Sequence, residues 1–198
     1  MKVVGISCSP RKGKSTFYAL ETCLQAAKEA VSGIETILVE LSEMKINGCI
    51  ACGKCMKVLG CSQEDDFVKM IPILSDSELA ALVIATPVYF GSMTSQCKAF
   101  LDRCVMFRRN GFLLRNKVGG VIAVGGVRNG GQELAIQAVQ AAMLVQDMVV
   151  VSEGRPTSHY GATLWSGHPD GIEKDTFGLE TARNLGKRVA EVAGRMHR

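Results

Sequence analysis

The sequence predicts an α/β protein whose parallel sheet of five strands is doubly wound, with helices on both faces. Apolar runs rich in β-branched residues alternate along the chain with segments whose apolar residues recur at helical spacing. A polar or glycine-rich segment follows the first, third and fourth of these runs. Because ligands of such sheets bind beyond the carboxyl ends of the strands, these three segments are the expected binding site.

The expected strands are residues 2–8, 34–41, 78–86, 118–125 and 148–152. The third of them is continuously apolar, which predicts a central position in the sheet. The second alternates between polar and apolar residues, which predicts an edge strand.

The expected helices end near residues 31, 104 and 146 after the first, third and fourth strands, and a last amphipathic helix covers about 174–197. A further short helix begins at Asp65 or Asp66, and Pro72 distorts it or ends it early. In the helix that ends near residue 146, the side chains expected to face inward are those of Leu134, Ala138, Ala141, Ala142 and Val145.

With 198 residues, the chain is expected to form one domain, 1–198, into which residues 47–64 are inserted as a loop. The formal charge of +4 is too small, and the basic residues are too dispersed, to indicate nucleic-acid binding. The sequence shows no secretory signal and no run of eighteen apolar residues, so we expect a cytoplasmic protein without membrane contact. In that reducing compartment, eight cysteines indicate metal or redox chemistry rather than disulfides.

Four of the cysteines form the most informative motif, with spacing C-x2-C-x2-C-x5-C: Cys49, Cys52, Cys55 and Cys61. Two residues between successive thiols let a loop fold back around one centre, as in the bacterial ferredoxin motif. These cysteines are therefore predicted to hold a [4Fe–4S] cluster, with zinc or a redox dithiol as alternatives. Of the others, Cys23, Cys97 and Cys104 are expected in the core, and Cys8 ends the first strand.

Residues 9–16, between the first strand and the first helix, are expected to bind a phosphate group. Free backbone N–H groups and the helix dipole favour an anion at such a turn. The end of the segment imitates a triphosphate-binding motif, but Cys8 stands where the first glycine of that motif would be, so a monophosphate is favoured. The predicted contacts are Ser9, Arg11, Lys14, Ser15 and Thr16. The alternative is that Ser15 simply caps the helix.

The segments after the third and fourth strands suit a flat ring. The first of them places aromatic residues at a strand end, where proline and glycine fix the turn, and its predicted contacts are Pro87, Val88, Tyr89, Phe90 and Gly91. The second has four glycines in residues 125–131, which allow close approach of the backbone, and its predicted contacts are Gly126, Arg128, Asn129 and Gly130. A phosphate site beside a ring site indicates flavin mononucleotide (FMN), since no G-x-G-x-x-G motif for a dinucleotide opens the first helix.

Residues 153–175 are rich in Gly, Pro, Ser and His and are expected to form a long loop without regular structure. Tyr160, Leu164 and Trp165 would then remain exposed. We therefore expect this segment to meet the cysteine loop, residues 47–64, across a homo-oligomer interface. The alternative is that Trp165 folds back onto its own sheet. His159 is either a proton donor to the flavin or its substrate, or a hydrogen-bonded interface residue.

These motifs, in this order, resemble the iron–sulfur flavoproteins of methanogens and other anaerobes, within the flavodoxin-like NADPH-dependent FMN reductase group. The resemblance spans essentially the whole chain and rests on Ser9-Pro10-Arg11 with Ser15-Thr16, the cysteine motif, Pro87-Val88-Tyr89-Phe90, residues 128–133 and residues 159–162. Lys14 departs from the family pattern, in which Asn or Ser is frequent. The resemblance implies a flavodoxin-like fold, FMN, a [4Fe–4S] cluster, a homodimer or homotetramer, ferredoxin as electron donor, and oxygen or peroxide as acceptor.

The expected function is electron transfer between the cluster and FMN. A cluster moves one electron at a time whereas a flavin can store two, so such a protein links a one-electron carrier to a two-electron acceptor. Two alternatives belong to other classes. One is an NAD(P)H-dependent flavin or quinone reductase whose cysteines hold zinc or have a structural role, and the other is a flavin-free redox sensor that signals through its cluster.

Overall fold

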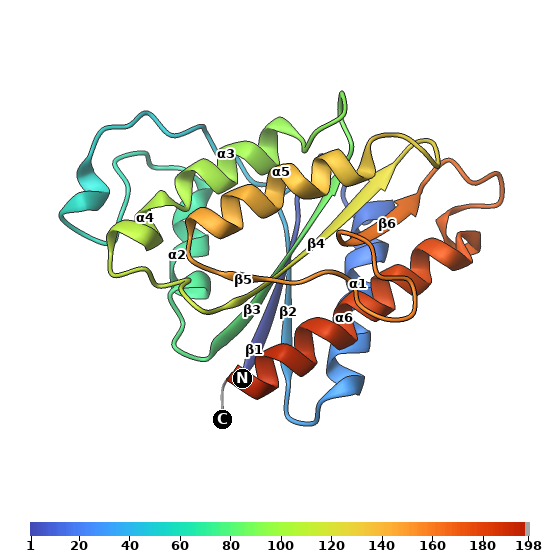
Figure 1. Ribbon diagram of the computed structural model, residues 1–198. Coiled ribbons are helices and arrows are strands. Elements are labelled where there is room, and N and C mark those ends of the chain that lie inside the picture. The colour runs from blue at the N-terminus through green and yellow to red at the C-terminus, as the bar shows by residue number, and fades with distance from the viewer. Residues whose placement is uncertain (197–198) are drawn as a thin grey trace.

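The computed structural model describes residues 1–196, which form a parallel sheet covered by helices on both faces (Figure 1). The strands are β1 (Lys2–Ser7), β2 (Glu35–Glu40), β3 (Leu79–Pro87), β4 (Val118–Gly125), β5 (Val149–Val150) and β6 (Ala162–Trp165). Their order is β2-β1-β3-β4-β5, β6 also pairs with β4, and every pair is parallel. This is the order of a flavodoxin-like, doubly wound sheet, so the predicted fold class is confirmed.

The positions of the individual strands follow from their hydrophobic patterns. β3 is buried along its whole length, as its uninterrupted apolar sequence requires between two layers of helices. β2, which alternates, lies at the edge of the sheet and is mostly half-buried. Both predictions are confirmed.

The fifth strand position is divided, and here the predicted five strands and the long structureless loop are wrong. β5 pairs only with the beginning of β4, at Val118 and Gly119, and β6 pairs with its last four residues. The chain leaves the sheet after β5 and rejoins it at Gly161, where an added Cβ would lie 2.5 Å from the Val121 carbonyl oxygen. A strand of four residues is too short to show a clear alternation of polar and apolar residues, so β6 was not predicted from the sequence.

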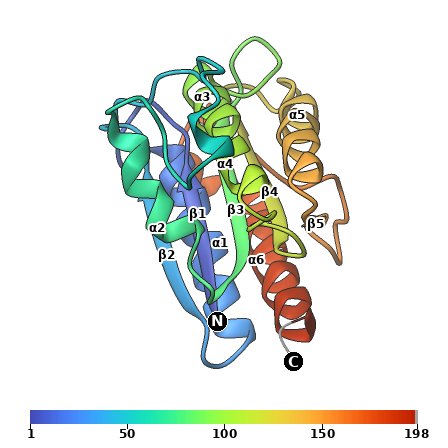
Figure 2. The ribbon, with the colours of Figure 1, turned by 90° about the vertical axis from the view of Figure 1, so that its left-hand side faces the viewer.

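The helices form two layers on opposite faces of the sheet (Figures 1 and 2). α1 (Ser15–Ala30) and α6 (Thr176–Met196) pack together on one face. α2 (Met70–Leu74), α3 (Ser95–Arg103), α4 (Val105–Arg109) and α5 (Gln132–Val145) lie on the other. Short 3-10 helices cover Lys54–Met56, Asp66–Lys69 and Ile172–Lys174. The core contains Cys23, Cys97 and Cys104 as predicted, and Cys8 is fully buried.

The predicted inward face of α5 is wrong. Its buried apolar side chains are those of Ala135, Ile136, Val139 and Met143. Leu134 and Val145 are instead exposed by 61% and 57%. α5 is apolar on both sides, so helical spacing alone does not identify the side that faces the sheet.

α6 begins two residues later than predicted because residues 172–174 form a separate 3-10 helix. Its predicted last residue, His197, lies outside the described residues. Ala182, Leu185 and Val189 are buried as expected, whereas Met196 is exposed by 42%. Within residues 1–196, the helices are too short or too polar to cross a membrane.

The contact between α1 and α6 generates a stability prediction. A Cβ on Gly186 would lie 2.0 Å from the Cys23 carbonyl oxygen of α1, so Gly186→Ala must push the helices apart and should cost at least about 2 kcal/mol. Gly194→Ala, in the same helix, meets only Val31 at 3.8 Å and should stabilise the protein by up to about 1 kcal/mol. Urea unfolding measures both values, and equal stability of the two variants would refute the close packing.

Candidate functional site

Three loops meet at the carboxyl edge of the sheet: residues 8–14 after β1, 88–94 after β3 and 126–131 after β4. Thr94 joins the first two, because its Oγ1 donates to the Cys8 carbonyl at 2.9 Å. The backbone N–H of Val88 donates to the Val124 carbonyl at 2.9 Å, and a Cβ on Gly131 would lie 3.2 Å from the Cα of Gly91. The three predicted binding loops are therefore neighbours in space, as parallel strand pairing requires.

The loop after β1 is built to leave the beginning of α1 open. Ser9 is buried, and its hydroxyl accepts the Arg11 N–H at 3.1 Å and donates to the Arg11 carbonyl at 3.2 Å, which folds the loop back on itself. The N-cap residue of α1 is Lys14, and no side chain caps the helix. The alternative of a cap by Ser15 is thus not what the structure shows, and the free amide end of α1 suits an anion.

A tight turn after β3 presents an aromatic side chain to solvent. Tyr89 and Ser92 exchange backbone hydrogen bonds of 2.9 and 3.1 Å, and the two residues between them, Phe90 and Gly91, have φ angles of 48° and 73°. Two positive φ angles define a type I′ turn, which is unfavourable for phenylalanine. The turn nevertheless leaves Phe90 fully exposed. Strain that holds an aromatic ring in solvent is typical of a binding site.

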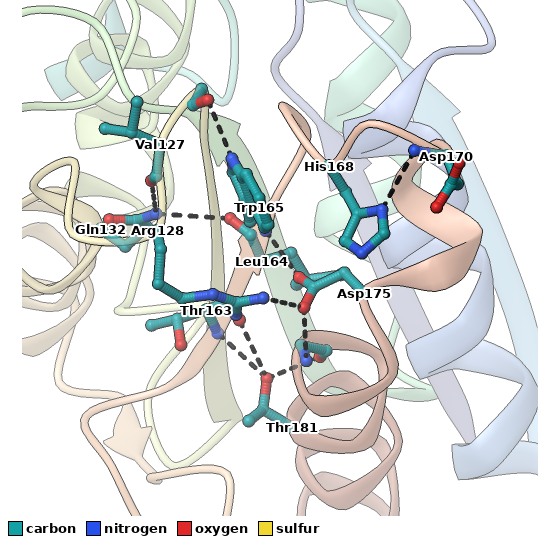
Figure 3. Close-up of polar contacts among 12 residues, drawn as sticks. Val127, Arg128, Gln132, Thr163, Leu164, Trp165, His168, Asp170, Asp175 and Thr181 are labelled. Atoms are coloured by element: carbon teal, nitrogen blue, oxygen red, sulfur yellow. Dashed lines mark hydrogen bonds and ion pairs between the residues drawn. The ribbon is translucent and has the colours of Figure 1, made fainter.

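The loop after β4 is held by Gln132 and Arg128 (Figure 3). Gln132 is buried; its Nε2 donates to the Val127 carbonyl at 2.7 Å and its Oε1 accepts the Gly130 N–H at 2.8 Å. Arg128 pairs with Asp175, a fully buried carboxylate that also accepts the Trp165 N–H at 2.7 Å. The guanidinium lies 5.3 Å from the centre of the Trp165 ring. A direct contact of Arg128 with a cofactor therefore stays a prediction.

The hydrogen bonds around Trp165 also show that part of the predicted exposed segment is packed against the sheet. Trp165 Nε1 donates to the Gly126 carbonyl at 3.1 Å, and Leu164 is fully buried in β6. Trp165 thus folds back onto its own sheet, as the alternative held, and the expectation that Leu164 and Trp165 await a partner is wrong. Asp175 precedes α6 by one residue and accepts the Gly178 N–H at 3.2 Å, so its position before a helix was the available signal for this capping role.

His159 lines a cavity of about 420 Å³ together with Arg128, Asn129, Gln132 and Phe177. Its Nδ1 lies 2.8 Å from Oε1 of Glu153, and the same oxygen accepts the His159 N–H at 2.6 Å. Glu153 is fully buried, so it fixes the ring orientation from below the surface. The structure thus brings His159, Arg128 and Asn129 to one cavity, and Glu153 is a partner that the sequence pattern did not reveal.

The cysteine loop is closed at its base by a buried ion pair. Arg103 at the end of α3 donates to both oxygens of Asp65, at 2.8 and 3.0 Å, and also to the Asn47 carbonyl at 3.0 Å. Asp65 in turn accepts the Asn47 N–H at 2.9 Å, so one pair ties together the two ends of the loop. Burial raises the pKa of Asp65, but the hydrogen bonds from Arg103, Asn47 and Phe67 outweigh it and hold that pKa below its usual value.

All four cysteines of the motif line a single cavity. None is in a disulfide. The Cys52 thiol lies 2.9 Å from the Ser62 hydroxyl, and this bond, followed by the Lys54 backbone, lowers the pKa of Cys52. Within residues 1–196, no three His, Cys, Asp or Glu side chains stand close enough together to hold a metal ion. The donor set of four thiols on one cavity nevertheless has the chemistry that an iron–sulfur cluster requires.

Comparison with known proteins identifies the family. Residues 1–163 match the family model described as NADPH-dependent FMN reductase. An iron–sulfur flavoprotein of Methanocaldococcus jannaschii is 43% identical, over 97% of both chains. One of Methanosarcina thermophila is 38% identical, over 97% of this chain and 95% of the relative. The chain belongs to this family of iron–sulfur flavoproteins. It is an oxidoreductase with a flavin-dependent redox role, and the resemblance drawn from its motifs is confirmed.

Solved structures support the fold alone. A flavodoxin-like, WrbA-like protein from Agrobacterium tumefaciens superimposes with a TM-score of 0.66 at 21% identity, covering 98% of this chain and 97% of that one. RosB, solved with the bound intermediate 8-demethyl-8-formylriboflavin-5′-phosphate, superimposes with a TM-score of 0.73 at 17% identity, covering 100% of this chain and 80% of that one.

The clamp at the loop base predicts an effect on stability that depends on pH. Asp65→Asn leaves Arg103 as an uncompensated buried charge and should cost about 3 kcal/mol at neutral pH. Because the pKa of Asp65 is lowered in the folded protein, its stabilisation exists at neutral pH and is lost as the pH falls below 3.8, so the variant and the native protein should converge in acid. Urea unfolding of both proteins, at neutral pH and below pH 3.8, measures the difference in their free energies of unfolding.

Asp66→Asn is the matched control. Asp66 pairs with Lys69 at the surface, where the lysine is 63% exposed, and it accepts the Lys45 N–H at 2.7 Å. An asparagine oxygen can still accept that N–H, so this variant should lose less than about 1 kcal/mol. Equal losses for Asp65→Asn and Asp66→Asn would show that the Arg103 pair does not hold the loop.

Proposed function

We propose that this protein transfers electrons between a one-electron carrier such as ferredoxin and a two-electron acceptor such as oxygen or peroxide, using FMN and a [4Fe–4S] cluster. The observation that carries the proposal is that four cysteines of a compact motif line one cavity, in a chain that matches the family model described as NADPH-dependent FMN reductase. When bound, the cluster supplies single-electron transfer and the flavin supplies storage of two electrons.

In this proposal the three loops at the sheet edge hold FMN. The open end of α1, with Ser9, Ser15 and Thr16 and the cations Arg11 and Lys14, binds the phosphate. The segment from Pro87 to Gly91 provides one wall for the ring, with Tyr89 half-exposed and Phe90 fully exposed beside it. The backbone of residues 126–130 approaches the other side of the ring, in the shape that Gln132 imposes.

In this proposal His159 holds a proton at the same edge. Nδ1 faces the buried carboxylate of Glu153, which favours the tautomer that donates from that nitrogen and leaves Nε2 for the cavity. A proton exchanged at Nε2 would accompany reduction of an acceptor in the cavity.

The surface of the cysteine loop suits an acidic electron carrier. Lys54 and Lys57 are exposed within the loop, alongside the exposed apolar side chains of Ile50 and Met56. Apolar contacts with a basic rim favour a transient, electrostatically steered encounter. We also propose a homodimer or homotetramer, because α5 leaves Leu134, Leu144 and Val145 exposed.

The family description favours a second candidate, an NAD(P)H-dependent FMN or quinone reductase in which the cysteines bind a structural metal or have no cluster role. Rapid flavin reduction by NADPH in a protein whose metal is colourless would support that candidate. Slow reduction by NADPH but fast reduction by reduced ferredoxin would support the first.

Cys52→Ser separates the two cofactors. The cysteine cavity and the three loops of the sheet edge share no residue, so the variant should lose its iron, and its reduction by ferredoxin, while it retains FMN. Iron and flavin content of the anaerobically purified variant measure this, with Cys23→Ala, a change in the core, as the control. Simultaneous loss of iron and FMN from Cys52→Ser alone would show that the loop is part of the flavin site.

Arg11→Ala tests the phosphate contact. Arg11 is proposed to meet only the phosphate, and a charge-assisted hydrogen bond contributes about 1.5–3 kcal/mol, so FMN should bind about tenfold to hundredfold more weakly while riboflavin is little affected. Lys12→Ala removes the same charge from the same loop, but Lys12 pairs with Glu43 at 2.7 Å and should have little effect. Fluorescence titration gives both affinities, and equal weakening of FMN and riboflavin by Arg11→Ala would contradict the assignment.

A further inference from the structure

Two arginines line the cysteine cavity, and neither belongs to the cysteine motif. Arg103 ends α3 and Arg109 ends α4, and both contribute to the wall that faces the four thiols. Their surroundings differ in one respect that decides what each can do, namely whether a carboxylate compensates the charge.

The charge of Arg103 is compensated. Its terminal nitrogens bond to both oxygens of Asp65, and the side chains of both residues are only 2% exposed. Its Nε is buried and forms no hydrogen bond within residues 1–196. Arg103 thus contributes little net charge to the cavity, and its main role is to close the loop base.

The charge of Arg109 is not compensated by a carboxylate. Within residues 1–196 no acidic side chain forms an ion pair with it, and its Nη1 donates to the sulfur of Cys55 at 3.2 Å. The next residue holds Cys55 in place, because Asn110 Nδ2 donates to the Cys55 carbonyl at 2.9 Å and to the Met106 carbonyl at 2.7 Å. The end of α4 therefore fixes both the backbone and the sulfur of one predicted cluster ligand.

We propose that Arg109 is a positioning residue that raises the reduction potential of the cluster through its hydrogen bond to the Cys55 sulfur. This inference rests on the proposed function. Reduction adds one electron from the carrier to the cluster, no bond to the protein breaks, and the negative charge at the sulfur ligands increases. A guanidinium donating to one of these sulfurs stabilises the reduced form more than the oxidised form.

Arg109→Gln tests this with Arg108→Gln as the matched control. Both substitutions remove one positive charge from adjacent positions of α4, but Arg108 lies over the Phe112 ring, 5.4 Å from its centre, and does not line the cavity. Electron paramagnetic resonance during a redox titration of the anaerobic holoprotein gives the midpoint potential. For Arg109→Gln the equilibrium constant of one-electron reduction should fall about threefold to tenfold, which corresponds to roughly 30–60 mV, and Arg108→Gln should change it far less. Equal shifts in the two variants would overturn the proposal.

Arg109→Lys covers the case in which Arg109→Gln fails to assemble a cluster. Lysine retains both the charge and an N–H donor for the Cys55 sulfur, so this variant should assemble the cluster with a midpoint near the native one. If it too lacks iron, or if its midpoint falls as far as that of Arg109→Gln, Arg109 is structural or acts without its charge, and the proposal is wrong. Native protein that holds no iron after anaerobic reconstitution would instead refute the proposed function itself, and this inference with it.

Discussion

Parallel pairing of β1, β3 and β4 is the constraint on which the rest of this structure depends. It sends the carboxyl ends of all three strands to one edge, where Thr94, Val88 and Gly131 join the following loops to one another. Each loop is then shaped by its own local chemistry. Ser9 folds the first, a type I′ turn exposes Phe90 in the second, and Gln132 holds the third.

The cysteine loop is attached to this sheet by a different interaction, the buried pair of Arg103 and Asp65. All of residues 47–64 are exposed or half-buried, so this loop has little core of its own and its ends must be fixed from outside. Arg103 does this from α3, which packs on the sheet through Phe100 and Cys97. Arg109 and Asn110, at the end of α4, form hydrogen bonds with Cys55. Two helices on the same face of the sheet therefore hold the wall of the cysteine cavity in place.

The sequence correctly predicted the structural features that depend on local residue patterns. Strand 118–125, the edge position of β2, the core cysteines and the compact cysteine motif were all predicted, because each is written in consecutive residues or in one period. The predictions that were wrong concern features that depend on tertiary contacts. α5 has two apolar sides, and only packing selects one, while β6 is too short to show a period.

The polar partners were beyond prediction for a related reason. Arg103 and Asp65 are 38 residues apart in the chain, and Arg128 and Asp175 are 47 apart. The sequence around each residue therefore does not indicate its partner. Glu153 is closer to His159, but its burial follows from the split of the fifth strand position, which the pattern did not reveal. The family was nevertheless accessible from the sequence, since the motifs on which the resemblance rests are local.

The most direct test of the account is the cofactor content of the native protein purified without oxygen. Iron, acid-labile sulfide and flavin should be present at about four, four and one per chain, as a [4Fe–4S] cluster and one FMN require. Zinc without sulfide, or a protein free of flavin, would contradict the central claim that this chain joins a cluster to FMN.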